Sequence, residues 1–564
     1  MKPAFDKIKS LYELVEISTE KFPDRIALSE YKNSKLITLT YLELMTSISK
    51  KANDLRNLGL KEGANIALSG SNSIDWVISF FSIVKIGCTA VPIDPKMNKQ
   101  GIEFILKYTE SKLFLVDKIK NFKLHQDYQS IIRSMDSAII KIESEKNKEL
   151  QSLILLKNID NEKYESENNI AEILFTSGTT GEPKGVILTH KNLLSNINYI
   201  HNILTLKSYE KSFSILPLHH VYELTCSILH NLSKGNYVHF CSKIDLPTMI
   251  KEMKEIKPTI WPVVPLILEK IHNGLNKKIS QSIIQRVLIN IAPKLFGRVL
   301  KHKLGLDNLK LLLSGGAALN SKVESFFKKI GMPITQGYGL SEASPLISVN
   351  PLGKEKIGSV GKVIESCKIR ITNLNDDGHG VIKAKGPNIF LGYYKNKKGT
   401  DEVLEDGWLN TGDIGYLDEE NYLYITGRDK FVIVNKGGKN IYPEEIEEFF
   451  SSSIYIEDIV VFSNNDKDII ALIYPEEELI KTKNIVEIRK IIYQEGIDIN
   501  KKLESYKRIN KFYITLDQFE KTSTQKIKRT FLREINLESY ISCLLYTSDA
   551  ADERSSVDLG GRRI

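Results

Sequence analysis

Helix-like segments alternate with short β-branched runs over most of this chain, from Leu11 to Asp429. The clearest apolar runs span residues 65–69, 89–93, 113–116 and 173–175. Alternation at this spacing is typical of βα units, in which helices bury both faces of parallel strands. The pattern therefore predicts an α/β fold with mixed, largely parallel sheets flanked by helices.

The chain is long enough for more than one hydrophobic core, since 564 residues predict two or three domains. Residues 358–429 change to short strands with Gly and Pro punctuation, which predicts a small β-rich subdomain at the end of an N-terminal domain of residues 1–429. Beyond it, a short strand, a Gly-Gly turn and a helix that begins at Pro443 predict a small α+β domain of residues 430–540.

The composition changes at the end of the chain. It is rich in Ile, Lys and Asn up to Tyr540, whereas residues 541–564 contain no lysine and include an Asp-Ala-Ala-Asp-Glu-Arg-Ser-Ser run. This tail resembles translated sequencing-library adapter, and we expect it to be non-native.

Charge, cysteine content and hydropathy exclude several classes of protein. The 78 basic and 70 acidic residues give a net charge of +8 without a basic block of the nucleic-acid-binding type. Five scattered cysteines without a CxxC pair provide no readable metal site or disulfide framework. The most apolar stretch, residues 76–92, is interrupted by Lys85 and Gly87 and predicts a buried helix and strand, not a membrane span. We expect a cytoplasmic protein, with peripheral contact to the inner membrane left open.

Residues 173–186, Ile-Leu-Phe-Thr-Ser-Gly-Thr-Thr-Gly-Glu-Pro-Lys-Gly-Val, carry the strongest chemical signal. Glycines let backbone N–H groups approach a polyphosphate, hydroxyls donate further hydrogen bonds, and Lys184 supplies positive charge. The phosphate loop of nucleoside triphosphatases, GxxxxGK[ST], does not fit, because Pro183 precedes the lysine and Gly185 follows it. The segment predicts a polyphosphate site of another class, and a Gly/Thr turn without function is the alternative.

Two further loops offer groups suited to a nucleotide. The apolar run 311–314 is followed by small residues from Gly315 onward, which leave room for a flat base. Residues 335–343, Thr-Gln-Gly-Tyr-Gly-Leu-Ser-Glu-Ala, provide an aromatic face at Tyr338, a hydroxyl at Ser341 and, at Glu342, a carboxylate that suits Mg²⁺. A packing role for the tyrosine is the alternative.

Together with four other segments in the same order, these loops resemble the acyl-adenylate-forming, or AMP-binding, superfamily. The others are residues 216–224, residues 407–413 with 427–430, residues 436–446 and residues 521–529. The resemblance extends from about Leu11 to Arg529 and is nearest to bacterial long-chain fatty-acid–CoA ligases. It implies a large N-terminal domain and a C-terminal domain that is mobile about a hinge.

The resemblance also implies a role for individual residues. ATP or AMP would contact Thr176, Ser177, Gly178, Thr179, Thr180, Lys184, Gly315, Gly316, Ala317, Gln336, Gly337, Tyr338, Gly339, Asp413 and Arg428. Glu342 would hold Mg²⁺ and Ser341 the α-phosphate, while His220 and Gly316 would border the acyl pocket. Lys430 would be the hinge, and Lys436, Gly437 and Gly438 would form a loop on the coenzyme A side.

Lys526 matches the catalytic lysine of the family. Gln525 stands where the family usually has glycine, so Lys528 is a competing candidate. The implied reaction joins a fatty acid to AMP from ATP, with release of pyrophosphate, and then transfers the acyl group to coenzyme A. An acyl-[acyl carrier protein] synthetase is the alternative, and a luciferase-like oxygenase or an inactive lipid-binding relative are more distant ones.

Overall fold

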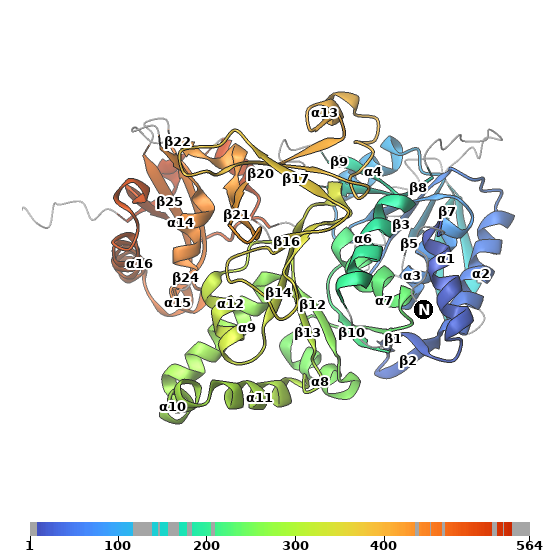
Figure 1. The fold of residues 1–564 in the computed structure, drawn as a ribbon, viewed down its shortest axis with the longest axis horizontal. Coiled ribbons are helices and arrows are strands. Elements are labelled where there is room, and N and C mark those ends of the chain that lie inside the picture. The colour runs from blue at the N-terminus through green and yellow to red at the C-terminus, as the bar shows by residue number, and fades with distance from the viewer. Residues whose placement is uncertain are drawn as a thin grey trace, which may run out of the picture. The chain divides into compact units, whose positions relative to one another are not determined.

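The computed structural model describes residues 8–116, 138–144, 147–155, 169–176, 183–204, 209–434, 439–451, 453–464, 468–521, 527–533 and 535–543 (Figure 1). The chain forms two compact units. The first consists mainly of Met1–Thr411 and Gly415–Ile425, and the second of Gly412–Ile414, Thr426–Thr522 and the residues from Ile527 onward. Within the described ranges, no helix combines the length and the apolar character that crossing a membrane requires.

A nine-stranded sheet organises one half of the first unit. Its order is β16-β15-β14-β13-β12-β10-β11-β1-β2, and the neighbours from β14 to β1 are parallel. The strands are β1 (Ile26–Lys32), β2 (Lys35–Thr40), β10 (Lys211–Ser214), β11 (Tyr237–Phe240), β12 (Ile260–Val263), β13 (Leu311–Ser314), β14 (Ile334–Gly339), β15 (Leu346–Val349) and β16 (Lys362–Val363).

A seven-stranded sheet organises the other half, in the order β6-β7-β5-β3-β4-β8-β9. Its strands are β3 (Asn65–Ser69), β4 (Thr89–Ile93), β5 (Leu113–Val116), β6 (Ala138–Ser144), β7 (Asn147–Leu155), β8 (Ile170–Thr176) and β9 (Lys184–Thr189). The four central strands, β5, β3, β4 and β8, are parallel. The predicted strands at 65–69, 89–93 and 113–116 are confirmed with these bounds, and 173–175 lies inside β8.

Helices fill the space between the two sheets and cover their outer faces (Figure 1). One core joins both sheets through α1 (Leu11–Lys21), α2 (Tyr41–Asn57), α3 (Ile74–Lys85), α6 (His190–Ile203) and α7 (His230–Ser233). Nine consecutive residues of α3, from Trp76 to Val84, are buried, which confirms a buried helix followed by strand β4 in the most apolar stretch. On the other face of the seven-stranded sheet, α4 (Lys99–Tyr108) packs through Ile102, Ile105 and Leu106.

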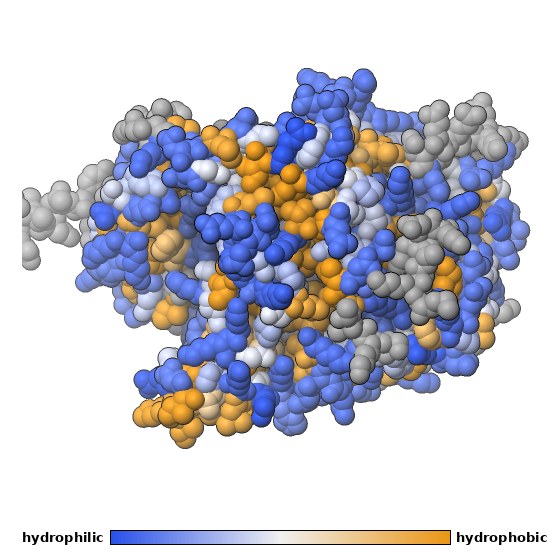
Figure 2. All heavy atoms as spheres, in the orientation of Figure 1, coloured by the Kyte–Doolittle hydropathy of each residue, from blue (hydrophilic) through white to orange (hydrophobic). Residues whose placement is uncertain are grey.

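A second core lies on the other face of the nine-stranded sheet. It contains residues of α8 (Leu246–Ile256), α9 (Pro265–Gln281), α10 (Ile283–Ile291), α11 (Pro293–Leu304) and α12 (Ser321–Lys329). Helices α9, α10 and α11 contact one another in sequence, and α11 also contacts α8. Figure 2 shows hydrophobic atoms gathered on the surface at α10, at the lower left of the view.

A five-stranded sheet follows, made of β17 (Lys368–Thr372), β18 (Gly380–Lys385), β19 (Leu404–Glu405), β20 (Trp408–Leu417) and β21 (Leu423–Arg428), with helix α13 (Lys397–Asp401). These strands fall within the β-rich region predicted for residues 358–429.

The second unit is an α+β structure around a four-stranded sheet, β24-β25-β26-β27. The sheet consists of β24 (Ile456–Ser463), β25 (Ile469–Pro475), β26 (Lys511–Ile514) and β27 (Ile541–Ser542). A short pair, β22 (Ile433–Val434) with β23 (Asn440–Ile441), and helices α14 (Pro443–Phe450), α15 (Glu477–Thr482) and α16 (Ile485–Asn500) complete it. Single turns of 3₁₀ helix span Asp429–Phe431, Ser505–Lys507, Arg529–Arg533 and Leu537–Ser539.

Strand β27 bears on the tail predicted for residues 541–564. Ile541 pairs with Ile514 of β26, and Cys543 is buried. The predicted tail therefore begins inside the sheet, and residues 544–564 lie outside the described residues.

Candidate functional site

The loops singled out in the sequence follow the carboxyl ends of the parallel strands. Residue Thr176 ends β8, and residues 216–224 come shortly after β10. Gly315 follows β13 directly, and residues 335–339 belong to β14. In open α/β sheets, ligands bind outside this edge, because strand ends and helix starts expose backbone groups there. The topology thus brings the predicted residues of the first unit to the expected edge of the sheets.

Lys184, Tyr393 and Glu342 form a connected series in the first unit. The Lys184 ammonium lies 4.8 Å from the centroid of the Tyr393 ring, within cation–π range. The Tyr393 hydroxyl donates a hydrogen bond of 2.8 Å to Oε1 of Glu342. Burial and the neighbouring carboxylate raise the pKa of Tyr393, so the phenol keeps its proton. A cation that can bind anions and a carboxylate that can bind a metal are therefore held by one aromatic side chain.

Backbone pairing brings Tyr393 to Lys184. The Ile187 amide donates to the Gly392 carbonyl at 3.1 Å, and the Tyr394 amide donates to the Gly185 carbonyl at 2.7 Å. A Cβ at Gly185 would lie 3.0 Å from Cγ2 of Ile173 and 3.1 Å from the Phe175 ring. A residue without a side chain permits this close approach between β8, β9 and the later segment.

The turn that presents Glu342 is fixed by amide side chains behind it. It is a 3₁₀ turn, Ser341–Ala343. The carbonyl of Ala343 accepts a hydrogen bond of 2.8 Å from the side-chain amide of Asn196, a buried residue of α6. The Asn388 amide donates to the Leu346 carbonyl at 2.9 Å, and the Phe390 amide donates to the Glu342 carbonyl at 2.9 Å. Because the backbone on both sides of the carboxylate is hydrogen-bonded, the Glu342 side chain starts from a fixed position.

Small residues border the space after β13. Gly315 is buried, and a Cβ there would lie 3.4 Å from the Tyr222 ring. Gly316 has a φ of +84°, which favours glycine, and it is exposed, while Ala317 is half-buried.

Strand β14 contains Tyr338, the residue predicted to face the base. Gln336 is buried and its carbonyl accepts from the Asn350 amide at 2.8 Å, whereas Gly337, Tyr338 and Gly339 are half-buried. A Cβ at Gly339 would lie 1.7 Å from the Pro345 carbonyl oxygen, so no side chain fits at this position.

Polar side chains that follow β3 and β4 of the seven-stranded sheet contact residues 216–224. The Asn72 amide donates to the Leu216 carbonyl at 2.6 Å, and its oxygen accepts from the Leu218 amide at 3.0 Å. His219 lies 3.7 Å from Asp94, measured from Nε2 to Oδ2, and its ring is 4.3 Å from that of His220. Burial lowers the pKa of His219 to about 4 and that of His220 to about 3, so both imidazoles are neutral near pH 7.

The helix after these histidines begins with buried polar groups. Residues Glu223–Leu229 form a π-helix, and all seven are buried. Oε1 of Glu223 accepts a hydrogen bond of 2.5 Å from the Ser214 hydroxyl. Burial raises the pKa of the Glu223 carboxyl to about 7. Within the described part of the chain, the buried Tyr222 hydroxyl and Oε2 of Glu223 have no hydrogen-bond partner. Buried polar groups without partners cost free energy in a hydrophobic core. A ligand that bound to them would remove this cost, so we connect them with ligand binding.

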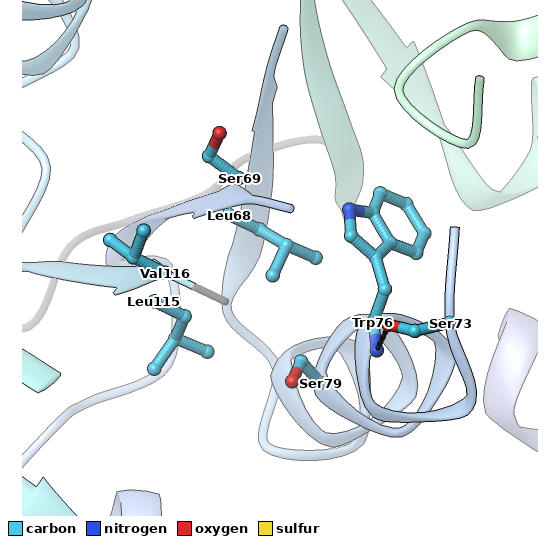
Figure 3. Close-up of a pocket in the computed structure, with 7 residues that line it drawn as sticks. All are labelled: Leu68, Ser69, Ser73, Trp76, Ser79, Leu115 and Val116. Carbon is cyan, nitrogen blue, oxygen red and sulfur yellow. Dashed lines mark hydrogen bonds between the residues drawn. The ribbon is translucent and has the colours of Figure 1, made fainter. Parts of the chain in front are cut away.

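A small cavity in the first unit lies between β3, β5 and α3 (Figure 3). It has a volume of about 10 Å³ and is lined by Leu68, Ser69, Ser73, Trp76, Ser79, Leu115 and Val116. The Ser69 hydroxyl and the Trp76 indole N–H are buried without a hydrogen-bond partner among the described residues. The cavity has room for one water molecule that would satisfy them, and it is too small for an acyl chain.

In the second unit, Asp413 and Arg428 form an ion pair. Nε of Arg428 lies 3.0 Å from Oδ1 of Asp413, and the aspartate is buried while the arginine is 41% exposed. A buried carboxylate of this kind can accept hydrogen bonds from sugar hydroxyls. Lys430, the predicted hinge, is exposed in the turn Asp429–Phe431.

Several predicted residues lie outside the described ranges: Ser177, Gly178, Thr179, Thr180, Lys436, Gly437, Gly438 and Lys526. Lys528, the competing candidate for the catalytic lysine, is described and lies 3.4 Å from the Glu520 carboxylate. The neighbouring Arg529 forms two hydrogen bonds of 2.8 and 2.6 Å to Glu447 of α14. The Arg529 contact is largely buried and holds this segment to α14, whereas the Lys528 pair lies at the surface and leaves the choice between Lys526 and Lys528 open.

Tyr393, Asn72 and Asp94 contact predicted site residues or segments, and the sequence analysis missed all three. Tyr393 is separated from Lys184 by more than two hundred residues, and no spacing connects them. The only available signal for Asn72 and Asp94 is that each follows a predicted strand closely, at the carboxyl end where ligands bind.

Metal binding at Glu342 would depend on the bound nucleotide, whose phosphate oxygens are needed as further metal ligands. Among the described residues, no group of three or more His, Cys, Asp or Glu side chains could hold a metal ion. A single carboxylate, that of Glu342, suits Mg²⁺, which binds to one or two carboxylates and takes its other ligands from phosphate oxygens and water.

Comparison with known proteins identifies the family. The model of the AMP-binding enzymes matches residues 15–394, and that of the AMP-binding enzyme C-terminal domain matches residues 429–544. A long-chain-fatty-acid–CoA ligase of Bacillus subtilis is 31% identical over 503 residues, which cover 80% of this chain and 82% of the relative. A chloroplastic long-chain-fatty-acid–[acyl-carrier-protein] ligase of Arabidopsis thaliana is 28% identical, over 83% of this chain and 77% of the relative.

Among solved structures, the O-succinylbenzoate coenzyme A synthetase of Bacillus subtilis in complex with ATP and magnesium ion has the same fold. The TM-score is 0.69 at 24% identity, and the match covers 92% of this chain and 99% of the other. Since the family models cover most of the sequence and relatives align with both units, the chain belongs to the AMP-binding enzymes, the superfamily of acyl-adenylate-forming ligases.

Proposed function

We propose that this protein is an ATP-dependent ligase that activates a long-chain fatty acid as its acyl-adenylate and transfers the acyl group to coenzyme A. The observation that carries the proposal is the 31% identity to a long-chain-fatty-acid–CoA ligase over 80% of the chain. The series Lys184–Tyr393–Glu342 supports the adenylation step, because it offers one group for phosphate and one for a divalent cation.

The adenylation step asks for charge stabilisation more than for covalent chemistry. A carboxylate oxygen of the fatty acid attacks the α-phosphorus of ATP, and pyrophosphate leaves with the electrons of the broken bond. Lys184 would bind phosphate oxygens, together with the hydroxyls of Thr176, Ser177, Thr179, Thr180 and Ser341. Mg²⁺, when bound, supplies positive charge that neutralises the phosphates.

Glu342 is the residue that would hold the metal. Its carboxylate accepts from the protonated Tyr393 hydroxyl, which fixes its orientation while the second oxygen remains for a ligand. Tyr338 would stack on adenine, beside Gly315, Gly316, Ala317, Gln336, Gly337 and Gly339.

The remaining roles follow the family. Asp413 and Arg428 would bind the ribose hydroxyls, and Lys526 would stabilise the charge that develops at the α-phosphate. A pivot at Lys430 would then bring Lys436, Gly437 and Gly438 to the thiol, which displaces AMP to form the thioester.

The neutral histidines suit an apolar acyl chain. A charged imidazole beside the pocket would need a counter-charge, and burial keeps His220 uncharged. We propose that His220 and Gly316 border the acyl chain on the side of the β10 loop. The protein would act in the cytoplasm.

Acyl carrier protein is the second candidate acceptor. A relative that is 28% identical over 83% of this chain is a long-chain-fatty-acid–[acyl-carrier-protein] ligase, and its adenylation step would need the same residues. The two candidates differ only in the thiol that displaces AMP.

Pyrophosphate release over a series of fatty acids tests the proposal. Each acid is assayed with coenzyme A, with holo-acyl carrier protein and with neither, and Lys526→Ala is the control. Turnover with coenzyme A and acids of palmitate length, lost in the control, is the expected result. Turnover only with the carrier protein would replace coenzyme A as acceptor, and turnover only with aromatic or short acids would overturn the fatty-acid assignment.

A further inference from the structure

Helices α10 and α11 expose an unusual number of large aliphatic side chains. On α10, Ile284 and Ile291 are 80% and 79% exposed, Ile283 is 72% exposed, and Val287 is 49% exposed. Residues 283, 287 and 291 are spaced by four and therefore form one stripe along the helix. Leu295 and Val299, 51% and 42% exposed, continue the spacing on α11. We call these six residues the α10–α11 stripe.

The stripe is separate from the contacts that hold these helices in place. Ile289 of α10 and Phe296, Leu300 and Leu304 of α11 are buried in the second core. A Cβ at Gly297 would lie 1.8 Å from the Ile330 carbonyl oxygen, so α11 packs directly against the end of α12. Each helix thus has one apolar face for the core and a second one at the surface, which Figure 2 shows as a hydrophobic patch.

Positive charge surrounds the stripe. Residues 270–306 contain no Asp or Glu and eight basic residues: Lys270, Lys277, Lys278, Arg286, Lys294, Arg298, Lys301 and Lys303. Arg286, Lys294 and Arg298 are exposed on the same two helices. This segment alone carries a charge of +8, equal to the net charge of the whole chain. The positive charge is therefore concentrated here and is less evenly spread than the overall counts indicate.

We propose that the α10–α11 stripe and its basic residues dock the protein on an anionic lipid bilayer. Isolated aliphatic side chains on a surface are ordinary, but a continuous stripe marks a contact with a membrane or another protein. Basic side chains beside it match the negative potential of anionic headgroups. Helix α10 has nine residues, too few to cross a bilayer, so it lies along the interface with the isoleucines among the acyl chains.

A second copy of the chain is a poorer occupant. Pairing two such surfaces would bring together two segments of charge +8 without an acidic residue in either. Like charges in contact oppose association. An acidic protein would match the charge but not the exposed isoleucines. Its polar groups would lose their water when they covered these apolar side chains, which costs free energy.

Helix α9 connects this surface with the acyl side of the candidate site. It begins at Pro265, next to Val264, whose Cγ1 would be 3.9 Å from a Cβ at Gly316. Its 17 residues lead to Ser282 at the start of α10, a distance of about 25 Å along the helix axis. If the proposed function holds, a lipid-soluble substrate is collected on the side of the molecule that leads to its pocket. Lipid docking itself does not depend on that function.

Co-sedimentation with vesicles tests the docking. The bound fraction is measured with vesicles of phosphatidylcholine and phosphatidylglycerol in equal parts, and with phosphatidylcholine alone. We expect binding to the anionic vesicles, at least tenfold weaker binding to the neutral ones, and a further loss in high salt. Ile284→Ser with Ile291→Ser, and separately Arg286→Ser with Lys294→Ser, should each reduce binding at least tenfold.

Matched variants separate this surface from general effects. Leu374→Ser removes another exposed aliphatic residue, 62% exposed, and Lys35→Ser with Lys397→Ser removes two exposed charges elsewhere. Both should bind as the parent does, and thermal melts should show that all variants are folded. Binding by the parent to neither vesicle, or equal losses in the matched variants, would overturn the proposal. So would an isoleucine variant that binds lipid normally but changes oligomeric state or binding to acyl carrier protein.

Discussion

Two tyrosine hydroxyls distinguish the proposed nucleotide side of the first unit from its proposed acyl side: Tyr393 has a hydrogen-bond acceptor, and Tyr222 has none among the described residues. Around Glu342, the backbone is hydrogen-bonded by Asn196 and Phe390, and the carboxylate by Tyr393. Around Tyr222 and Glu223, buried oxygen atoms lack partners within the described residues. A phosphate group has the same shape in every turnover, so its site can be fully preorganised.

Replacing Glu342 should give the largest effect on the nucleotide side. Under the proposed function, Glu342→Ala removes the carboxylate that holds Mg²⁺ and should lower kcat for pyrophosphate release by roughly 10²–10³-fold, the usual loss of a charge-stabilising group. Glu342→Gln, which keeps the hydrogen bond to Tyr393 but not the charge, should be nearly as poor. A loss below tenfold in both variants would show that the metal is held elsewhere.

Glu223 should dominate the pH dependence of stability on the acyl side. Burial raises its pKa from 4.5 to about 7, so the neutral form is favoured in the folded state. The stability that this carboxyl contributes is complete below pH 4.5 and is lost as the pH rises through 7. Glu223→Gln keeps an acceptor for Ser214 and should therefore gain roughly 2 kcal/mol relative to the parent between pH 5 and pH 8.

Denaturant unfolding of the parent and Glu223→Gln at pH 5, 6, 7 and 8 measures this difference. Ser214→Ala serves as the comparison, because it removes the hydrogen bond and leaves the carboxyl. Parallel pH profiles for the parent and Glu223→Gln would contradict the assignment.

Tyr393→Phe removes one hydroxyl from the proposed nucleotide side, where it donates to Glu342. The ring remains over Lys184, but Glu342 loses its donor, and kcat should fall roughly tenfold, the equivalent of one charge-assisted hydrogen bond. The positioning role predicts that the Mg²⁺ concentration for half-maximal activity rises as well, which a purely structural role would not cause. Steady-state titrations with Mg²⁺ decide between them.

Tyr222→Phe is the matched change on the other side, and it should have the smallest effect. The Tyr222 hydroxyl is buried without a partner among the described residues, so its removal should leave stability unchanged or raise it by up to about 1 kcal/mol. Thermal unfolding of the two variants side by side tests the comparison directly. A destabilisation as large as that of Tyr393→Phe would mean that the two sides do not differ.

Much of the architecture could be predicted from the sequence, because buried parallel strands are short apolar runs with clear ends. Strands β3, β4 and β5 have the predicted bounds, and Lys184 and Glu342 are recognisable from local residue patterns. The roles assigned to the site residues, Lys184, Glu342 and Lys526 among them, stay predictions.

What the sequence could not reveal depends on contacts between distant segments. Tyr393 reaches Lys184 only because its segment pairs with β9, and no local pattern records that pairing. The α10–α11 stripe has the periodicity of an ordinary core-facing helix. Only the three-dimensional arrangement shows that a second apolar face points to the surface.

The division into two units determines what an optical probe of unfolding can report. All three tryptophans, Trp76, Trp261 and Trp408, belong to the first unit. Trp76 and Trp261 are buried, with indole N–H groups that have no protein partner among the described residues, so their emission should be blue-shifted in the native protein. Tryptophan fluorescence will therefore follow the first unit alone, whereas far-ultraviolet circular dichroism follows both. If the second unit melts separately, circular dichroism will record a transition that does not appear in the tryptophan fluorescence.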